Sequence, residues 1–560
     1  MCKLSTVYYR KFTSMIRRKK LLLATVLALM LLSAFTFGDK YFKITQSISI
    51  FSTMYKEVFT YYVEDVNPNK LMQTSIDAML QSLDPYTNYI SEDRIEDYRT
   101  LNTGEYGGIG ASTVRIEGKT YISMIFEGYP AQNSDLTIGD EVIAINHVDI
   151  TRKSKDDISQ LMKGQKESEV VITVNRFGKN NPLNISVSRE KITIENVPYY
   201  GLMDGNTGYI KLNEFTMNAS GNVKKALLEL KKQGAENFIL DLRGNPGGLL
   251  IESVKLSNLF LPKGVPIVST KGKVEENDTE YISRFNPIEL NAPIVVLINS
   301  QSASASEIVA GVIQDYDRGV IVGHKSYGKG LVQTTRRLSY NAQLKVTTAK
   351  YYIPSGRCIQ ALDYSNRRPD GSVGNVPDSL ISEFRTQNGR VVFDGGGVDP
   401  DIKIDQDAAP VITKQLTQKG FIFQYATEYF YSNSTIAPAT DFHLSNAEYS
   451  HFVKWVQKEE FEYVTEVEKN LLNIKKSAKS EGNWKEIEKQ YEELKHNISV
   501  QKSNDFITFK SQILRLLENE IVSRYYLQRG AIEAGFGEDL FVSKAVDILN
   551  DPSAYSKILN

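Results

Sequence analysis

Between residues about 193 and 410, short apolar strands alternate with helical segments, and this alternation constrains the fold more than any other feature of the chain. The pattern predicts strands over residues 208–212, 238–242, 294–298, 320–322 and 344–352, and helices over 222–233 and 305–316. Strands that alternate with helices in this way build a layered α/β domain. Two of the strands end in turns rich in Gly, Pro, Ser and Ala.

The segments around this α/β domain follow other patterns. Residues 41–103 have apolar side chains at helical spacing, whereas residues 104–192 are short β-rich runs separated by turns and predict a small β-rich module. Residues 411–560 are mostly helical with long charged faces, for which we favour a solvated helical appendage over a dimerisation or docking element. A chain of 560 residues with 41% hydrophobic residues is an ordinary multidomain globular protein.

The N-terminal residues 1–40 have the features of an export signal. Six Lys and Arg residues between Arg10 and Lys20 precede an uncharged apolar run over residues 21–38. The run is at the short limit for a membrane span and long for the apolar part of a signal peptide. We predict an anchor or signal segment, with a preference for an anchor in the inner membrane. The positive flank stays in the cytoplasm, so the other domains are expected in the cell envelope, on the periplasmic side.

Composition excludes several functional classes. Lys and Arg number 66 and Asp and Glu 67, so the formal charge is -1 and no nucleic-acid-binding surface is expected. Two Cys residues cannot form a disulfide framework when one lies in the basic N-terminus. The chain has five His residues and no HExxH motif, so we expect neither a metal site nor chemistry that depends on a His cluster.

The segment 299–307, Asn-Ser-Gln-Ser-Ala-Ser-Ala-Ser-Glu, follows a hydrophobic strand and enters a helix. Small residues at such a turn let a hydroxyl project while the N–H groups of the first helical turn face it. The same run also fits an ordinary helix N-cap. Local pattern alone does not choose among Ser302, Ser304 and Ser306.

A second segment, residues 323–333, places Lys329 between two glycines. No Ser or Thr follows this Lys, so the segment is not a phosphate-binding P-loop. Burial disfavours the charged form of a Lys amine, and a neutral Lys within hydrogen-bond reach of a Ser hydroxyl forms a Ser–Lys dyad that needs no His.

A third segment, the turn 241–248, reads Asp-Leu-Arg-Gly-Asn-Pro-Gly-Gly. It fits an ordinary tight turn. It also fits a close backbone approach to a substrate carbonyl, where an N–H of Gly247 or Gly248 and the N–H after a nucleophile would form an oxyanion hole.

Together the three segments resemble the carboxyl-terminal processing, or tail-specific, proteases of the S41 serine peptidase family. That family has a nucleophile in a SASASE-type segment, a Lys 25 residues later in a [ST][FY]GKG segment and a Gln four residues further on, all of which match here. Residues 352–357 and 397–401 also match the family pattern, and the resemblance covers residues about 45 to 405. It implies a multidomain α+β fold with a layered α/β (ClpP/crotonase-like) protease core, an inserted PDZ domain and helical segments at both ends.

The resemblance also implies the site residues. These are the nucleophile Ser304, the base Lys329, the orienting Gln333, the oxyanion donors Ala305 and Gly247 or Gly248, and the supporting Glu307 and Asp315. No metal or organic cofactor is implied. Three residues near the site remain undecided or secondary: Arg243 and Arg357 fit either substrate contacts or structural ion pairs, and His324 is expected at a strand end, outside the dyad.

The β-rich module at residues 104–192 resembles a PDZ domain. Gly107, Gly108, Ile109 and Gly110 correspond to the loop and strand that receive a peptide carboxylate, and Ile125 is expected to help form the side-chain pocket. An extended C-terminal peptide would add a strand to the sheet there.

The sequence therefore predicts a serine endopeptidase that cleaves exported proteins with accessible C-termini, selected by the PDZ domain. The alternative is a catalytically inactive, membrane-tethered peptide-binding adaptor. A homo-oligomer is possible in either case.

Overall fold

The computed structural model describes residues 41–203, 206–405 and 409–560, so the predicted apolar run over residues 21–38 lies outside the described residues. The chain divides into two compact units at residue 85. In the first unit, residues 41–61 are helical and are followed by α2 (Pro68–Gln81). The side chain of Asn67 caps α2 by accepting a hydrogen bond from the N–H of Lys70. Within the described ranges, no helix combines the length and apolar character of a membrane span.

In the second unit, the β-rich module forms a sheet with strand order β3-β4-β5-β7-β8 and a separate β2–β9 pair. Its elements are β2 (Glu105–Gly108), β3 (Ala111–Ile116), β4 (Lys119–Ile125), α4 (Pro130–Asn133), β5 (Glu141–Ile145), β6 (Val148–Asp149), α5 (Lys155–Met162), β7 (Glu169–Asn175), β8 (Leu183–Ser188) and β9 (Glu190–Thr193). In β7, Val170, Ile172 and Val174 are buried, which is the period of two expected for a strand with one face on a core. β3 lies at the edge of its sheet.

The α/β core is a mostly parallel sheet with strand order β10-β11-β12-β15-β16-β21, in which only β10 runs antiparallel among the described strands. Its elements are β10 (Tyr199–Met203), β11 (Thr207–Lys211), α6 (Ala219–Lys232), β12 (Asn237–Asp241), α7 (Leu250–Ser257), β15 (Ile294–Ile298), α8 (Ala305–Asp315), β16 (Val320–Gly323) and β21 (Ile402–Lys403). All residues of β12 and β15 are buried, because helices cover both faces of the sheet.

A second sheet has strand order β1-β18-β13-β14, with β17 paired to β18. Its strands are β1 (Asn88–Ile90), β13 (Pro266–Gly272), β14 (Thr279–Ile282), β17 (Leu331–Arg337) and β18 (Gln343–Tyr352). The remaining elements before residue 405 are η1 (Glu92–Arg94), α3 (Ile95–Thr103), η2 (Glu275–Asn277), η3 (Asp378–Leu380), β19 (Glu383–Arg385) and β20 (Val391–Phe393).

The C-terminal residues form helices that pack in two places. They are α9 (Val411–Gln418), α10 (Phe421–Ser432), α11 (Asn446–Lys458), α12 (Glu466–Glu481), α13 (Trp484–Ser503), α14 (Asp505–Thr508), α15 (Lys510–Ala534), α16 (Leu540–Leu549) and α17 (Pro552–Leu559). Helices α9, α10, α11 and α15 share a core that includes the fully buried Phe452, Leu517 and Ile521. α10 also reaches the β-rich module, where Phe423 joins its core.

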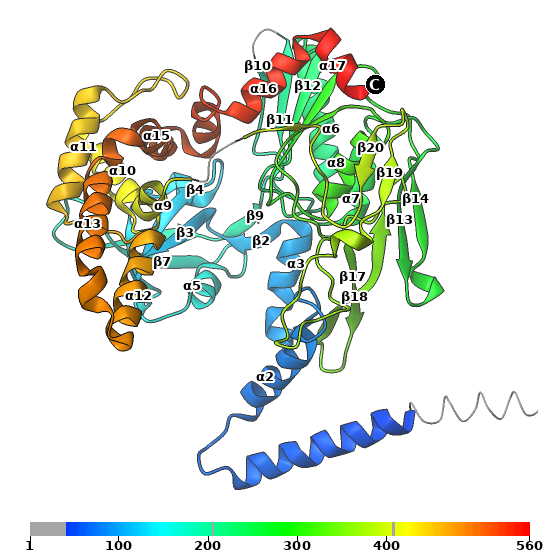
Figure 1. Cartoon of the computed structure of the whole chain (residues 1–560), viewed down its shortest axis with the longest axis horizontal. Helices are drawn as coiled ribbons and strands as arrows, with labels where there is room; N and C mark the ends of the chain where they lie inside the picture. The colour runs from blue at the N-terminus through cyan, green and yellow to red at the C-terminus, as the bar shows by residue number, and fades with distance from the viewer. Residues whose placement is uncertain (1–40, 204–205, 406–408) are drawn as a thin grey trace, which may run out of the picture. The chain divides into compact units, whose positions relative to one another are not determined.

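The last two helices return to the α/β core. α6, α7 and α8 pack on one face of its sheet, and Phe541, Val542 and Ala545 of α16 pack on the other. Figure 1 shows α16 next to strand β12. The prediction of a solvated appendage is therefore wrong for α16 and α17. The predicted fold class is confirmed: the protein is a multidomain α+β molecule with a layered α/β core and an inserted β-rich module.

Candidate active site

Ser304 is held in a strained backbone conformation between β15 and α8. Its φ is 55° and its ψ is -113°, values that a non-glycine residue adopts at a cost of about 1–3 kcal/mol. The two neighbouring serines are fully buried and committed elsewhere: the Ser302 hydroxyl donates to the carbonyl of Leu242 at 2.8 Å, and the Ser306 hydroxyl donates to that of Asn245 at 3.0 Å. Of the three candidate serines, Ser304 is the one that lines a cleft.

A single carboxylate joins the Ser304 turn to the Lys329 segment. Glu307 is fully buried, and its Oε2 accepts hydrogen bonds from the N–H groups of Ser304 at 2.7 Å and Lys329 at 2.9 Å. Its Oε1 accepts from the Gly328 N–H at 2.7 Å and from the Ser326 hydroxyl at 2.6 Å. Burial raises the pKa of Glu307, and these hydrogen bonds oppose the rise. The backbones that carry Ser304 and Lys329 are thus fixed to the same side chain.

Lys329 and Gln333 line the same cleft as Ser304, which has a volume of about 400 Å³. The Lys329 Nζ lies 4.2 Å from the centroid of the Tyr86 ring. Gln333 lies on β17, and its Nε2 donates to the Thr347 hydroxyl of β18 at 3.2 Å. This bond fixes the amide plane of Gln333 and leaves its carbonyl oxygen as the end that can accept a hydrogen bond.

The turn 241–248 packs directly against the N-terminus of α8. A Cβ added to Gly247, whose φ is +100°, would lie 2.7 Å from the Ala303 carbonyl oxygen and 2.9 Å from the Ala305 nitrogen. The Gly247 N–H donates to the Asn245 side chain at 2.9 Å. Within the described part of the chain, the N–H groups of Gly248 and Ala305 have no protein acceptor. The geometry therefore favours Gly248 over Gly247 as the partner of Ala305 in an oxyanion hole.

The rest of the cleft wall is mixed in character. Its apolar residues include Leu101, Leu249, Leu250, Ile308, Leu331, Val332 and Tyr351. Glu214, which sequence reasoning missed, also lines the cleft, and burial raises the pKa of its carboxyl group. It follows β11 by three residues. The signal that could have identified it is this position, because side chains beyond the carboxyl ends of parallel strands meet at one edge of the sheet.

Three family models match the chain in succession. The PDZ domain model matches residues 107–187, the model of peptidase family S41 matches residues 206–373, and the model described as "Probable PDZ-protease, C-terminal helical domain" matches residues 412–549. The Carboxy-terminal-processing protease of Bartonella bacilliformis is 34% identical over 342 residues, which are 60% of this chain and 76% of that protein.

This chain belongs to the carboxy-terminal-processing proteases of peptidase family S41. It is a serine peptidase with a PDZ domain. A probable CtpA-like serine protease of Staphylococcus aureus is also 34% identical, over 311 residues that make up 55% of this chain and 61% of that relative, so the match spans less than two thirds of its length. Among solved structures, a photosystem II D1 C-terminal processing protease is 24% identical and covers 67% of this chain and 97% of its own, with a TM-score of 0.35.

In the protease, four of the five predicted PDZ residues lie in β2 or in the link from β2 to the edge strand β3, and Ile125 pairs with Ala111 of β3. Gly107 and Gly108 end β2, and Gly110 immediately precedes β3. Ile109 and Ile125 are 2% and 5% exposed and belong to the core of the module. Ile125 also lines a small cavity together with Tyr129 and Arg529.

The undecided arginines of the protease form ion pairs. Arg357 is buried and donates to Asp315 at 2.9 Å, so the predicted supporting residue Asp315 anchors the segment after β18 at the far end of α8 from Ser304. Arg243 pairs with Asp241 and Asp539. The ring of His324 packs edge-on against Phe541 at 5.1 Å, and its Nε2 lies 2.8 Å from the carbonyl oxygen of Ile404.

Proposed function

We propose that the protease cleaves peptide bonds with Ser304 as the nucleophile and Lys329 as the general base. The neutral Lys329 amine takes the hydroxyl proton as Ser304 Oγ attacks the scissile carbonyl, and it then gives that proton to the leaving amine. An acyl-enzyme forms on Ser304, and water releases it. The observation that carries this proposal is the buried Glu307 carboxylate, which holds the N–H groups of both residues beside one cleft.

Gln333 serves as the orienting residue in this proposal. Its amide is held by Thr347, so its carbonyl oxygen can accept a hydrogen bond from the Lys329 amine. The Tyr86 ring, whose centroid lies 4.2 Å from Lys329 Nζ, would cover one side of that amine. Both contacts would restrict the amine to few orientations before substrate arrives, which is the basis of efficient proton transfer.

The proposed oxyanion hole consists of the N–H groups of Ala305 and Gly248. Both belong to turns that are crowded against each other, so their positions relative to Ser304 change little during a reaction. Each such donor is worth roughly 3–4 kcal/mol of transition-state stabilisation in characterised serine proteases.

We propose further that the PDZ domain selects substrates by their C-terminal tails. β3 is an edge strand, which is the feature a peptide needs to add a strand to the sheet. The N–H groups around residues 107–110 would receive the terminal carboxylate. Amidation of a substrate's C-terminus should then raise KM, whereas a change far from the C-terminus should not.

For localisation, we propose an exported protein whose catalytic domains act in the periplasm. The support is the basic stretch before residue 21 and the apolar run after it. Fractionation of cells, followed by N-terminal sequencing of the mature protein, distinguishes an anchored form from a cleaved one. Size-exclusion chromatography with light scattering tests whether the protein forms a homo-oligomer.

The dyad is tested with Ser304→Ala and Lys329→Ala, assayed on an unfolded protein with an apolar C-terminus. Each variant should lose roughly 10³-fold or more in kcat while remaining folded. Lys325→Ala is the matched control, because Lys325 lies in the same segment and is exposed. A serine-reactive probe should label Ser304 in the wild type, as located by peptide mass spectrometry.

Wild-type activity in Ser304→Ala or in Lys329→Ala would exclude the dyad. The alternative function, an inactive peptide-binding adaptor, requires that the wild type binds the substrate and leaves it intact. Labelling of Ser304 by the probe would contradict that alternative.

A further inference from the structure

The turn 241–248, which holds Gly248, one of the two proposed oxyanion donors, is attached to a helix near the end of the chain. Arg243, within the turn, donates from Nη1 to Asp539 Oδ1 at 2.8 Å, and its Nη2 lies 2.8 Å from Asp539 Oδ2. This paired geometry is the strongest that an Arg–carboxylate contact offers. Both side chains are largely shielded from water, at 17% and 19% exposed. Asp539 is also the N-cap of α16, where its Oδ1 accepts from the N–H groups of Phe541 and Val542.

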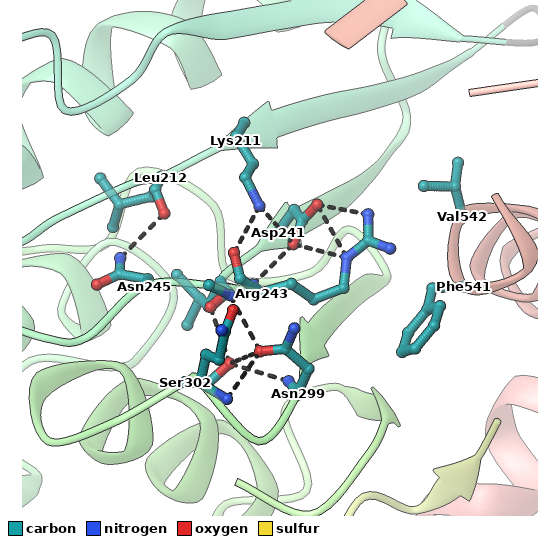
Figure 2. A network of polar contacts seen from close by, with 12 residues as sticks. Lys211, Leu212, Asp241, Arg243, Asn245, Asn299, Ser302, Phe541 and Val542 are labelled. Atoms are coloured by element: carbon teal, nitrogen blue, oxygen red, sulfur yellow. Dashed lines mark hydrogen bonds and ion pairs between the residues drawn. The ribbon is translucent and has the colours of Figure 1, made fainter. Parts of the chain in front are cut away.

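The other side of Arg243 is fixed by a buried carboxylate. Asp241 is fully buried and accepts from Arg243 Nη2 at 2.7 Å, from the Arg243 N–H at 2.8 Å and from the Tyr209 hydroxyl at 2.6 Å. Lys211 lies 3.2 Å from the same carboxylate and donates to the Arg243 carbonyl at 2.7 Å. Figure 2 shows Lys211, Asp241 and Arg243 in this arrangement, with Phe541 beside them. Two carboxylates, Asp241 and Asp539, therefore balance two cations.

The same turn is also bonded to the segment that precedes the nucleophile. Asn299 Oδ1 accepts from the Gly244 N–H at 3.0 Å, and the Ala303 N–H donates to the Asn245 carbonyl at 3.0 Å. The turn is consequently held between two supports, the Ser304 segment on one side and α16 on the other. A displacement on the α16 side would tilt the Gly248 N–H relative to Ser304.

α16 is itself well anchored, so it can serve as a fixed support. Phe541 and Val542 are buried in the core on the face of the sheet opposite to α8. The guanidinium of Arg243 lies 4.9 Å from the centroid of the Phe541 ring. This contact adds a cation–π attraction to the ion pair between Arg243 and Asp539.

We propose that Asp539 is a positioning residue for catalysis. Through its ion pair with Arg243, it fixes the turn 241–248, here called the oxyanion turn, to α16. This inference rests on the proposed oxyanion hole of Gly248 and Ala305. Loss of the Asp539 charge leaves Lys211 and Arg243 with one carboxylate between them, and the Arg243 side chain loses its second anchor. The turn then has more freedom at the moment when the oxyanion forms. The C-terminal helices thus contribute to the chemical step although they do not line the cleft.

The decisive variant is Asp539→Asn, because Asn keeps the N-cap acceptor of α16 and removes the charge. We expect kcat on a chromogenic peptide to fall roughly ten- to a hundredfold with KM almost unchanged, which is less than the loss of a whole oxyanion donor. Asp539→Glu should restore most of kcat. Asp547→Asn is the matched control, since Asp547 is an exposed residue of the same helix.

The readouts separate this inference from the proposed function and from misfolding. Thermal unfolding of each variant gives the folded fraction to which kcat is normalised. Wild-type kcat per folded molecule in Asp539→Asn, or a change confined to KM, would overturn the positioning role even if the probe labels Ser304. Full activity in Ser304→Ala would instead overturn the proposed function on which the inference rests.

Discussion

Glu307 links the two halves of the proposed dyad. Four donors converge on its carboxylate, three of them backbone N–H groups, and two of these belong to Ser304 and Lys329. The strained φ of Ser304 persists because this side chain and the neighbouring turn over-determine its position. Glu307 therefore fixes the positions of Ser304 and Lys329 before substrate binds, and it need not touch the substrate to do so.

Replacing Glu307 with Gln should weaken the link between the backbones of Ser304 and Lys329. The amide has one acceptor oxygen, so its NH₂ group must face two of the four donors. We expect a loss of about 1–3 kcal/mol in the free energy of unfolding and a fall in kcat per folded molecule. Urea denaturation and steady-state kinetics measure both, with the exposed Glu466→Gln as control. Unchanged kcat in Glu307→Gln would contradict the linking role.

The substitution Gly247→Ala tests how tightly the turn 241–248 packs against the N-terminus of α8. An Ala at this position would place its Cβ 2.7 Å from a backbone oxygen, in addition to the strain of a φ of +100°. Gly264→Ala is a close control, because Gly264 has a φ of +94° and an added Cβ there meets nothing within 4 Å. We expect Gly264→Ala to cost about 1 kcal/mol of stability with normal kcat. Gly247→Ala should lose kcat as well, and equal kinetics in the two variants would show that the turn tolerates displacement.

At the scale of elements, α8 has a function at each end. Its N-terminus presents Ser304 and the Ala305 N–H, and its C-terminus holds the segment after β18 through Asp315 and Arg357. Ser355 donates its N–H to the same Asp315 carboxylate at 2.9 Å. The contacts of Asp315 at this end of α8 are structural. We therefore expect them to affect the stability of the fold and not the catalytic rate of folded molecules.

Arg357→Met should therefore destabilise the protein without changing its chemistry. Removal of one member of a buried ion pair costs about 3–5 kcal/mol, because the remaining charge is left without a partner. The pair between Arg385 and Glu383 is a suitable control, since its side chains are 64% and 51% exposed and Arg385→Met should cost less than about 1 kcal/mol. Denaturation curves measure both. A fall in kcat per folded molecule in Arg357→Met would contradict this purely structural role.

The network around Asp241 predicts a pH effect on stability. Burial alone would raise the pKa of Asp241, but Lys211 and Arg243 outweigh it and hold that pKa well below its ordinary value of 3.8. A lowered pKa in the folded state stabilises the protein above the unfolded value and loses this effect as the pH falls toward the folded value. The stability difference between wild type and Asp241→Asn should be constant above about pH 5 and shrink in more acidic solution. A difference that does not change between pH 5 and pH 2.5 in urea titrations would contradict the ion-pair role.

On the scale of the whole molecule, the C-terminal helices connect to both the PDZ domain and the protease core. Phe423 of α10 is buried in the PDZ core, where its ring lies 5.5 Å from that of Tyr121 and under the guanidinium of Arg524. Leu527, which packs on the same core, interrupts α15 with a φ of 54°. Within the second unit, the helices after residue 410 therefore contact both the PDZ domain and the α/β core.

Phe423→Ala should loosen the PDZ domain from the C-terminal helices. Truncation of a buried Phe typically costs about 3–5 kcal/mol, partly through the cavity it leaves. Hydrogen exchange should accelerate in β4 and in the helices around α10, while the α/β core keeps its protection. Phe393→Ala, at a ring that is 48% exposed, serves as control. Uniform acceleration through the whole second unit would mean that these parts unfold as one cooperative block.

The sequence by itself determined the local features of this protein. Hydrophobic periodicity located β11, β12, β15 and β16 of the α/β core and missed β10 and β21 at the edges of that sheet. The spacing of residues 304, 329 and 333 matched a known family of serine peptidases. The small residues at two strand ends indicated turns, which we propose approach a substrate. Periodicity and turn composition depend on neighbouring residues, and the spacing of a motif is read directly from the sequence.

Only the tertiary structure decided how distant segments meet. It showed that Ser302 and Ser306 are committed to backbone carbonyls, that Gly247 donates to Asn245, and that Arg243 is paired with a residue 296 positions away. It also showed that α16 packs on the sheet of the α/β core, although the sequence predicted that the core ends at residue 410. Such contacts depend on which surfaces pack together and not on local pattern, because an amphipathic helix has the same sequence signature whichever apolar surface covers it.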